Sequence, residues 1–476
     1  MSYGGQPMVF NSIKFILFFL PIFLIIYYIF PNKAKNAVLF LSSIVFYLLG
    51  ANRPGVKWSL IFIIISILLN YILGKIIFIK RKNNIKIANA VLFIGIIFNF
   101  AALCYFKYTN FFIETINSIF RSEIARVEIA VPIGISFFTF QAVSYLCDVK
   151  RGEIKHIDNI AVFSTYLLMF PKMLAGPITK YGELQNDLNS RKITAENLES
   201  GLKIFIFGLG YKVILADTIA TLWASTSRYG YDSLSTPMAW LGAVAFSFDI
   251  FFDFQGYSLM AQGLGTMMGI SIPQNFNSPY ISSSMGEFWR RWHMTLGRWF
   301  KEYLYFPLGG SKCSNAKILR NTFIVWAFTG LWHGASWNFV LWGLSFFVFL
   351  TLERYVYGKA LAKTHILKHV YVIVFIPVTW ILFAITNIKD IGIYFSRMFP
   401  FAGTPDYIST RDFATTIKNY WVILIACVFF SLPFAEKFLR KHQKNIIVEI
   451  ILIVIFGYSL YRLHISTSNP FMYLQF

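Results

Sequence analysis

Two histidines in apolar surroundings are the residues of this chain best suited to acid–base chemistry. His333 lies in "WAFTGLWHGASWNFVLWGL", residues 326–344, and His293 lies in "GEFWRRWHMTLGRWFKEYLYFPLGG", residues 286–310. An imidazole inside a membrane span normally faces the bundle interior or a water-filled cavity, and in its neutral form it accepts a proton from a hydroxyl group. The sequence predicts that His333 is a general base. The alternative is a structural histidine that is hydrogen-bonded across helices.

Small residues surround His333. Gly330 and Gly334 bracket it with a G-x-x-x-G spacing, which lets another backbone approach closely. On one apolar helix over 318–350, His333 shares a face with both glycines and with Trp337. We therefore expect a tightly packed helix that presents the imidazole to a neighbour.

Charge in this apolar chain concentrates around His293. The composition is 57% hydrophobic and only 14% charged. On a helix over 287–303, tryptophans and other apolar side chains form one stripe, basic side chains lie opposite, and His293 lies at the border. This pattern predicts an interfacial helix at the membrane surface. Its arginines either anchor the topology or bind phosphates, and the sequence leaves both interpretations open. They are Arg290, Arg291 and Arg298.

The elements that must position these residues are membrane helices. Apolar runs long enough to span a bilayer recur along all 476 residues. They cover 11–30, 58–79, 87–106, 201–223, 318–350, 370–387, 420–435 and 446–463, with weaker candidates at 34–50, 130–147, 159–177 and 238–262. We expect an all-α polytopic membrane protein with about ten to twelve membrane segments, several of them broken or re-entrant.

The chain is expected to form one membrane domain over 1–476. Ordinary spans alternate with short loops in 1–128, and plain spans return in 346–476. The middle, 130–345, is rich in Gly, Pro, Trp, His and charge within its apolar stretches. The chemistry is expected in this middle part.

Basic loops indicate sidedness, not nucleic-acid binding. The net charge is +21, and Lys and Arg in short loops of a membrane protein mark the cytoplasmic side. "KRKNNIK" (80–86) and "GGSKCSNAK" (309–317) are therefore predicted to be cytoplasmic, and the N-terminus to lie outside. The four cysteines form no Cys-x-x-Cys pair, so neither a disulfide framework nor a metal site is predicted.

Five stretches are distinctive: "VPIGISFFTFQAVSYLCDVKRGE" (131–153), "FPKMLAGPI" (170–178), "DFQGYSLMAQGLGTMMGISIPQNFNSPY" (253–280), "EFWRRWHMTLGRWFKEYLYFPLGG" (287–310) and "LWHGASWNFVLWG" (331–343). Together they make the chain similar to the membrane-bound O-acyltransferase family, in particular its bacterial alginate O-acetylation branch. The terminal "NPFMYLQF" (469–476) also resembles that branch. The resemblance covers nearly the whole chain.

The resemblance implies a central tunnel through the membrane domain. The histidine of the family's W-H-G motif is catalytic and lies deep in this tunnel; it corresponds to His333. His293, in W-R-R-W-H, would be the second catalytic residue and line the tunnel from the cytoplasmic side. Trp292 and Trp332, which precede the two histidines, are expected to line or orient the tunnel.

A third motif implies further orienting residues. Asp253 and Tyr257 match the family, and a buried aspartate needs a partner. Where the alginate branch reads "DFSGYSDMAIG", this chain reads "DFQGYSLMAQG". The carboxylate missing at Leu259 leaves the identity of the acceptor or the partner open, but not the reaction class.

The resemblance also implies an activity. An O-acyltransferase of the cell membrane, multi-pass, would pass an acyl group, in the first instance acetyl, from a cytoplasmic thioester to hydroxyls of an exported cell-surface or extracellular polysaccharide. The donor would be acetyl-CoA or an acyl carrier protein, with no bound cofactor. Beyond the resemblance, we infer from their charge that Arg290, Arg291 and Arg298 bind its phosphates. An extracytoplasmic esterase-like partner would complete the transfer, and the C-terminal tail is a candidate docking surface for it.

Two alternatives remain. One is transfer of D-alanine from a carrier protein to teichoic acid. The other is a membrane transporter without acyl transfer, which gives His333 no special role.

Overall fold

The computed structural model describes residues 8–51, 55–228, 230–401, 403, 408, 411–465 and 471–472. Within these ranges, the only regular elements are helices, as expected for an all-α protein. Eight of the described helices are long and apolar enough to cross a membrane, and two shorter apolar helices cover Lys14–Ile29 and Lys35–Gly50. The chain is a polytopic membrane protein, and the total of ten to twelve segments stays a prediction.

The chain packs as two compact units. The first extends through Phe205 and includes Met260–Pro273, and the second comprises Ile206–Leu259 and the chain from Gln274 onward. This division describes packing, so the expectation of one membrane domain stays a prediction. The first unit contains α1 (Leu20–Ile29), α2 (Lys35–Ala51), α3 (Val56–Asn83), α4 (Ile85–Leu103), α5 (Thr109–Phe120), α6 (Ile135–Arg151), α7 (Ile160–Leu168), α8 (Phe170–Met173), α9 (Tyr181–Ser190) and the start of α10 (Ala195–Gly210).

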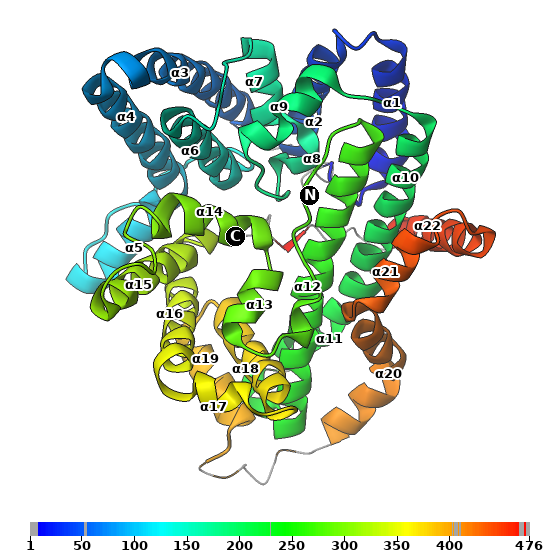
Figure 1. The fold of residues 1–476 in the computed structure, drawn as a ribbon. Helices are drawn as coiled ribbons and strands as arrows, with labels where there is room; N and C mark the ends of the chain where they lie inside the picture. Colours follow the sequence, from blue (N-terminus) through cyan, green and yellow to red (C-terminus); the bar gives the residue numbers. More distant parts are fainter. Residues whose placement is uncertain are drawn as a thin grey trace. The chain divides into compact units, whose positions relative to one another are not determined.

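The second unit carries both histidines. Its helices are α11 (Asp217–Arg228), most of α12 (Thr236–Met267), α13 (Met285–Arg291), α14 (Met294–Phe300), α15 (Asn315–His333), α16 (Trp337–Leu352), α17 (Gly358–Ala362), α18 (Leu367–Ala384), α19 (Ile388–Met398), α20 (Arg411–Ser431), α21 (Phe434–Lys441) and α22 (Ile446–Ile465) (Figure 1). Short π-helical turns extend several of them: η3 (Tyr211–Ala216), η6 (Lys301–Tyr305) and η7 (Glu353–Tyr357). The middle of the sequence therefore folds mainly as short helices joined to a few long ones.

Apolar side chains cover the outside of the long helices. On α22, Ile453 and Val454 are 68% and 64% exposed, and on α3 Trp58 is 75% exposed. In water such a surface would be costly, whereas hydrocarbon solvates it. The outward apolar faces identify these helices as lipid-facing.

Two helices expected from the sequence are interrupted at the histidines His293 and His333, and one segment that was a weak candidate for a membrane span belongs to a long helix. The continuous helix predicted over 318–350 was wrong: α15 ends at His333 and α16 begins at Trp337. Gly330 lies against Phe339 and Gly343 against Trp326, so the two helices form an antiparallel hairpin. The helix predicted over 287–303 was also wrong, because it is interrupted at His293. The weak candidate 238–262 is part of α12, which is 32 residues long. Periodicity did not detect the two breaks because apolar residues lie on both sides of each.

The α15–α16 hairpin depends on the predicted small residues. A Cβ atom at Gly330 would lie 2.4 Å from Phe339 O, and one at Gly343 would lie 2.4 Å from Trp326 O. Either contact is shorter than real Cβ atoms make, so only glycine permits this approach. The close packing expected at Gly330 is thus confirmed, with α16 as the neighbour. Trp337, expected on the His333 face, instead starts α16.

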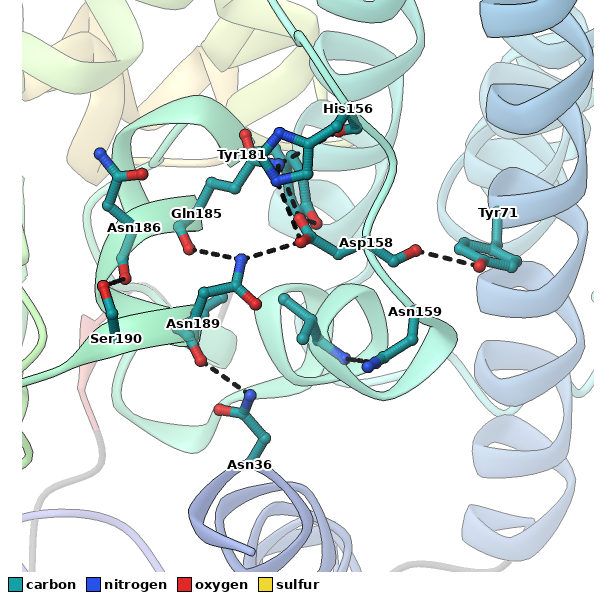
Figure 2. A network of polar contacts seen from close by, with 12 residues as sticks. Asn36, Tyr71, His156, Asp158, Asn159, Tyr181, Gln185, Asn186, Asn189 and Ser190 are labelled. Carbon is teal, nitrogen blue, oxygen red and sulfur yellow. Dashed lines mark hydrogen bonds and ion pairs between the residues drawn. The ribbon is translucent and has the colours of Figure 1, made fainter. Parts of the chain in front are cut away.

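A separate polar network stabilises the first unit around Asp158 (Figure 2). Its carboxylate accepts hydrogen bonds from the hydroxyl of Tyr181 and from the amides of Gln185 and Asn189, both on α9. Its main-chain oxygen accepts a hydrogen bond from Tyr71 on α3. The network ties the segment that precedes α7 to α3 and α9. It is far from His293 and His333 in the sequence.

Candidate active site

His293 occupies a strained break between α13 and α14. Its backbone has φ 44° and ψ 53°, in the left-handed region, which costs a residue other than glycine about 1–2 kcal/mol. Two main-chain hydrogen bonds hold the break: Met294 N donates to Asn275 O, and Asn277 N donates to Arg291 O, both at 2.9 Å. Strained residues of this kind cluster at functional sites, so the break supports the assignment of His293.

Asn275 determines which nitrogen of His293 can accept a proton. Asn275 Oδ1 accepts the Thr295 main-chain N–H at 3.2 Å and lies 3.1 Å from His293 Nδ1. An amide oxygen only accepts, so His293 Nδ1 carries the hydrogen and Nε2 is the acceptor nitrogen of the neutral ring. Burial lowers the pKa of His293, which lies outside the eight candidate spans, to about 3. The ring is therefore neutral near pH 7.

His333 lies at the C-terminal end of α15 in an aromatic enclosure. Its ring centroid is 4.9 Å from those of Trp332 and Trp342, and 5.3 Å from that of Phe383. The side chain is 5% exposed. The break after α15 places the imidazole at the end of a helix, where rings from α16 and α18 surround it.

Trp332 links the two histidines. Its ring centroid lies 6.2 Å from that of His293 and 4.9 Å from that of His333. Both imidazoles therefore border one indole inside the second unit. The structure brings together two histidines that are 40 positions apart in the sequence. The structure places His293, His333 and Trp332 side by side, and their catalytic and tunnel-lining roles stay predictions.

The tryptophan stripe of α13 packs against protein. Trp292 stacks on Phe288 with centroids 5.4 Å apart and contacts Trp380 at 5.0 Å. Trp289 packs edge-on against Trp326 at 4.8 Å and Phe346 at 4.8 Å. Aromatic pairs in these geometries contribute about 0.5–1.5 kcal/mol each beyond area burial. The stripe anchors α13 to α15, α16 and α18, which fixes the position of His293.

The three arginines have different environments. Arg291 donates from Nε to Glu287 Oε1 at 2.8 Å. Burial alone would raise the pKa of Glu287, but hydrogen bonds from Ser283 and the charge of Arg291 lower it to about 2. Arg290 is exposed and Arg298 is half-buried. Arg291 is thus committed to a local ion pair, while Arg290 faces solvent.

Asp253 has the partner that its burial requires. Its Oδ1 lies 2.5 Å from Lys212 Nζ, and its Oδ2 accepts Met472 N–H at 3.0 Å. Lys212 also contacts Asp217 at 2.8 Å. Tyr257, one turn after Asp253, packs edge-on against Phe471 at 4.9 Å. Both predicted orienting residues therefore contact the segment 471–472, while the rest of the tail 469–476 lies outside the described residues.

Sequence reasoning missed Lys212 and Asn275. A lysine inside the apolar run 201–223 requires a carboxylate partner, and Asp253 was the buried carboxylate that lacked one. The lysine within an apolar run could therefore have predicted the pair of Lys212 and Asp253. Asn275 had no comparable signal, because only the fold brings the loop before α13 beside the break that follows α13.

Comparisons with known proteins show the family of this chain. The family model of MBOAT, the membrane-bound O-acyltransferase family, matches residues 17–397, which include Asp253 and both histidines. This chain belongs to the membrane-bound O-acyltransferase family. It is a multi-pass membrane O-acyltransferase.

Individual relatives differ in their named substrates. The chain is 36% identical to the probable alginate O-acetylase AlgI of Pseudomonas aeruginosa, over 83% of this chain and 75% of the relative. It is 34% identical to the peptidoglycan O-acetyltransferase of Helicobacter pylori, over 80% and 78%. It is 31% identical to the teichoic acid D-alanyltransferase of Streptococcus thermophilus, over 44% and 54%.

Proposed function

We propose that this protein transfers an acetyl group from a cytoplasmic thioester toward hydroxyl groups of an exported polysaccharide, at the cell membrane. The observation that carries the proposal is the pair of buried histidines on either side of the Trp332 contact, with the His293 tautomer fixed by Asn275. Two relatives are matched over most of their length, and their names, probable alginate O-acetylase and peptidoglycan O-acetyltransferase, support the acyl group and the acceptor class.

The chemistry requires one base and one leaving thiol. A neutral imidazole, His333 in this proposal, takes the proton of the acceptor hydroxyl as the oxygen attacks the thioester carbonyl. The C–O bond forms, the C–S bond breaks, and the proton passes to the departing thiolate. His293 borders the donor side and presents Nε2 as a hydrogen-bond acceptor. The aromatic enclosure excludes water, which limits hydrolysis of the thioester.

Exported acceptors create a problem of sidedness that a membrane acyltransferase solves. Thioester donors stay inside the cell, whereas the polysaccharide lies outside, so the acyl group must cross and not its carrier. An extracytoplasmic esterase-like protein would supply the hydroxyl that accepts the acyl group in that step, and it would then pass the acyl group to the polysaccharide. No cofactor is required, because the thioester supplies an activated acyl group.

Transfer of D-alanine to teichoic acid is the second candidate. It is supported by a relative of that name, which matches less than half of this chain. The acetyl proposal has support over a larger part of the sequence.

Alkaline release of esters from cell-surface polymers tests the proposal. Cells that produce the protein should release acetate, identified by mass spectrometry, and cells with His333→Ala at equal expression should not. Release of D-alanine instead of acetate would favour the second candidate. Absence of any ester that depends on the protein would exclude both and favour transport.

A further inference from the structure

A basic pocket of about 630 Å³ opens in the second unit, apart from the histidines. It lies where α13 begins and where the α15–α16 hairpin has its open ends. The polar residues that line it are Ser283, Ser284, Thr322, Arg354, Lys359 and Lys368, together with Glu353.

The charge of this pocket is positive. Glu353 is the only acidic residue that lines the pocket. Its carboxylate accepts hydrogen bonds from the main-chain N–H groups of Met285 at 2.7 Å and Gly286 at 3.2 Å, so it caps the N-terminus of α13. Among the described residues, no ion pair is found for Arg354, Lys359 or Lys368. Three cations that face one pocket with one committed carboxylate favour an anionic ligand, and phosphate oxygens suit Arg and Lys together.

The pocket lies at the end of the hairpin opposite to His333. Thr322 and His333 are separated by eleven residues of α15, or about 17 Å at 1.5 Å per residue. The same end carries the basic 309–317 loop, which the positive-inside bias assigns to the cytoplasm. Arg290 is close by: a Cβ at Gly286 would lie 3.3 Å from Glu353 Oε1 and 3.5 Å from Arg290 Nη1.

We propose that this pocket binds the phosphate groups of a nucleotide-linked thioester of the coenzyme A class, an inference that rests on the proposed acyl transfer. A pantetheine arm has about the backbone length of four to five extended residues, or about 15 Å. This length matches the separation between the pocket and His333, so a donor whose phosphates lie in the pocket can bring its thioester near the histidines.

The number of cations favours a free coenzyme over a carrier protein. Coenzyme A carries a diphosphate and a 3′-phosphate close together, which matches three cations around one pocket. The arm of a carrier protein has a single phosphodiester, and the protein would dock through a broad acidic face. Arg354, Lys359 and Lys368 are therefore assigned as donor-binding residues, with Arg290 at the border of their pocket.

Binding of 3′-phosphoadenosine 5′-diphosphate to the full-length protein in detergent tests the assignment. This nucleotide half of coenzyme A has no thiol and no acyl group, so its binding is independent of catalysis. Arg354→Gln, Lys359→Gln and Lys368→Gln should each raise its Kd by roughly tenfold, as loss of a charge-assisted hydrogen bond does. Lys363→Gln, an exposed change on the same segment outside the pocket, should stay near wild type.

Three outcomes discriminate the proposals. Equal Kd values for the wild type and all three pocket variants would overturn the pocket assignment. Absence of nucleotide binding, with ester formation driven only by an acylated carrier protein, would overturn the assignment and leave O-acyl transfer standing. If the nucleotide binds with the predicted losses but no thioester yields an ester, the pocket stands as an anion site, and both the acyl-transfer proposal and the donor role are rejected.

Discussion

His293 Nδ1 lies 3.1 Å from Asn275 Oδ1, and this contact fixes the nitrogen that can receive a proton. Asn275→Ala removes the acceptor and lets the ring rotate or change tautomer. We expect kcat to fall about tenfold to hundredfold, the usual effect of losing a buried hydrogen bond, while the donor KM changes little. Steady-state acyl transfer by the purified variant measures both. The exposed Asn277→Ala should keep wild-type rates. Equal kcat values for the two variants would mean that Asn275 is not a positioning residue.

His333→Ala should abolish acyl transfer at unchanged expression and membrane insertion. The side chain is enclosed by Trp332, Trp342 and Phe383, so no other described residue of that enclosure offers a basic nitrogen. Loss of a general base costs about 10²–10⁴ in rate. The matched control is His365→Ala, at an exposed position. Substantial ester formation by His333→Ala would return this histidine to a structural role.

Stability should depend on pH through His293. The pKa of an unfolded histidine is about 6.5, whereas burial lowers that of His293 to about 3. Below pH 6.5 the unfolded chain therefore binds a proton that the folded chain does not. The stabilisation is complete above pH 6.5 and is lost toward pH 3, by up to about 1.4 kcal/mol per pH unit.

Melting temperatures in detergent at pH 7.5 and 5 measure this dependence. His293→Gln cannot titrate, so its Tm should fall less on acidification than that of the wild type. His365→Gln should behave like the wild type. An unchanged pH dependence in His293→Gln would contradict a neutral, buried imidazole.

Removing Lys212 should destabilise the second unit strongly. Lys212→Met leaves Asp253 and Asp217 close together without a cation, and breaking a buried pair costs about 3–5 kcal/mol. The control is Arg126→Met, because Arg126 and its partner Glu114 are both exposed and such pairs contribute at most about 1 kcal/mol. Thermal melting should show a clearly larger loss for Lys212→Met. Similar losses would mean that the pair contributes little.

The 309–317 loop should lie in the cytoplasm. Cys313 is only partly exposed and its Sγ lies 3.4 Å from Gly310 O, so Ser311→Cys in a cysteine-free chain is the better probe. A membrane-impermeant thiol reagent should label it only after the cells are opened. Labelling in intact cells would invert the orientation, and both the cytoplasmic pocket and the transfer across the membrane would have to be abandoned.

Much of this protein follows from its sequence alone. Long apolar runs predict membrane helices because, in lipid, the backbone can satisfy its hydrogen bonds only in a helix or in a closed barrel. The W-R-R-W-H and W-H-G stretches identified the two histidines, and Gly330 indicated close packing beside His333. Each of these inferences depends on residues near one another in the chain, where spacing and composition carry the information.

Tertiary structure decided how those residues meet. The left-handed turn at His293 and the break after His333 are invisible to helical periodicity, because apolar side chains lie on both sides of each. The partners of the site come from distant segments: Asn275 for His293, Lys212 for Asp253, and Trp380 for Trp292. Hydrogen bonds and ring contacts act over a few ångströms of space, whereas sequence records only separation along the chain. Folding therefore set the proton-accepting nitrogen of His293 and grouped Arg354, Lys359 and Lys368 around one pocket.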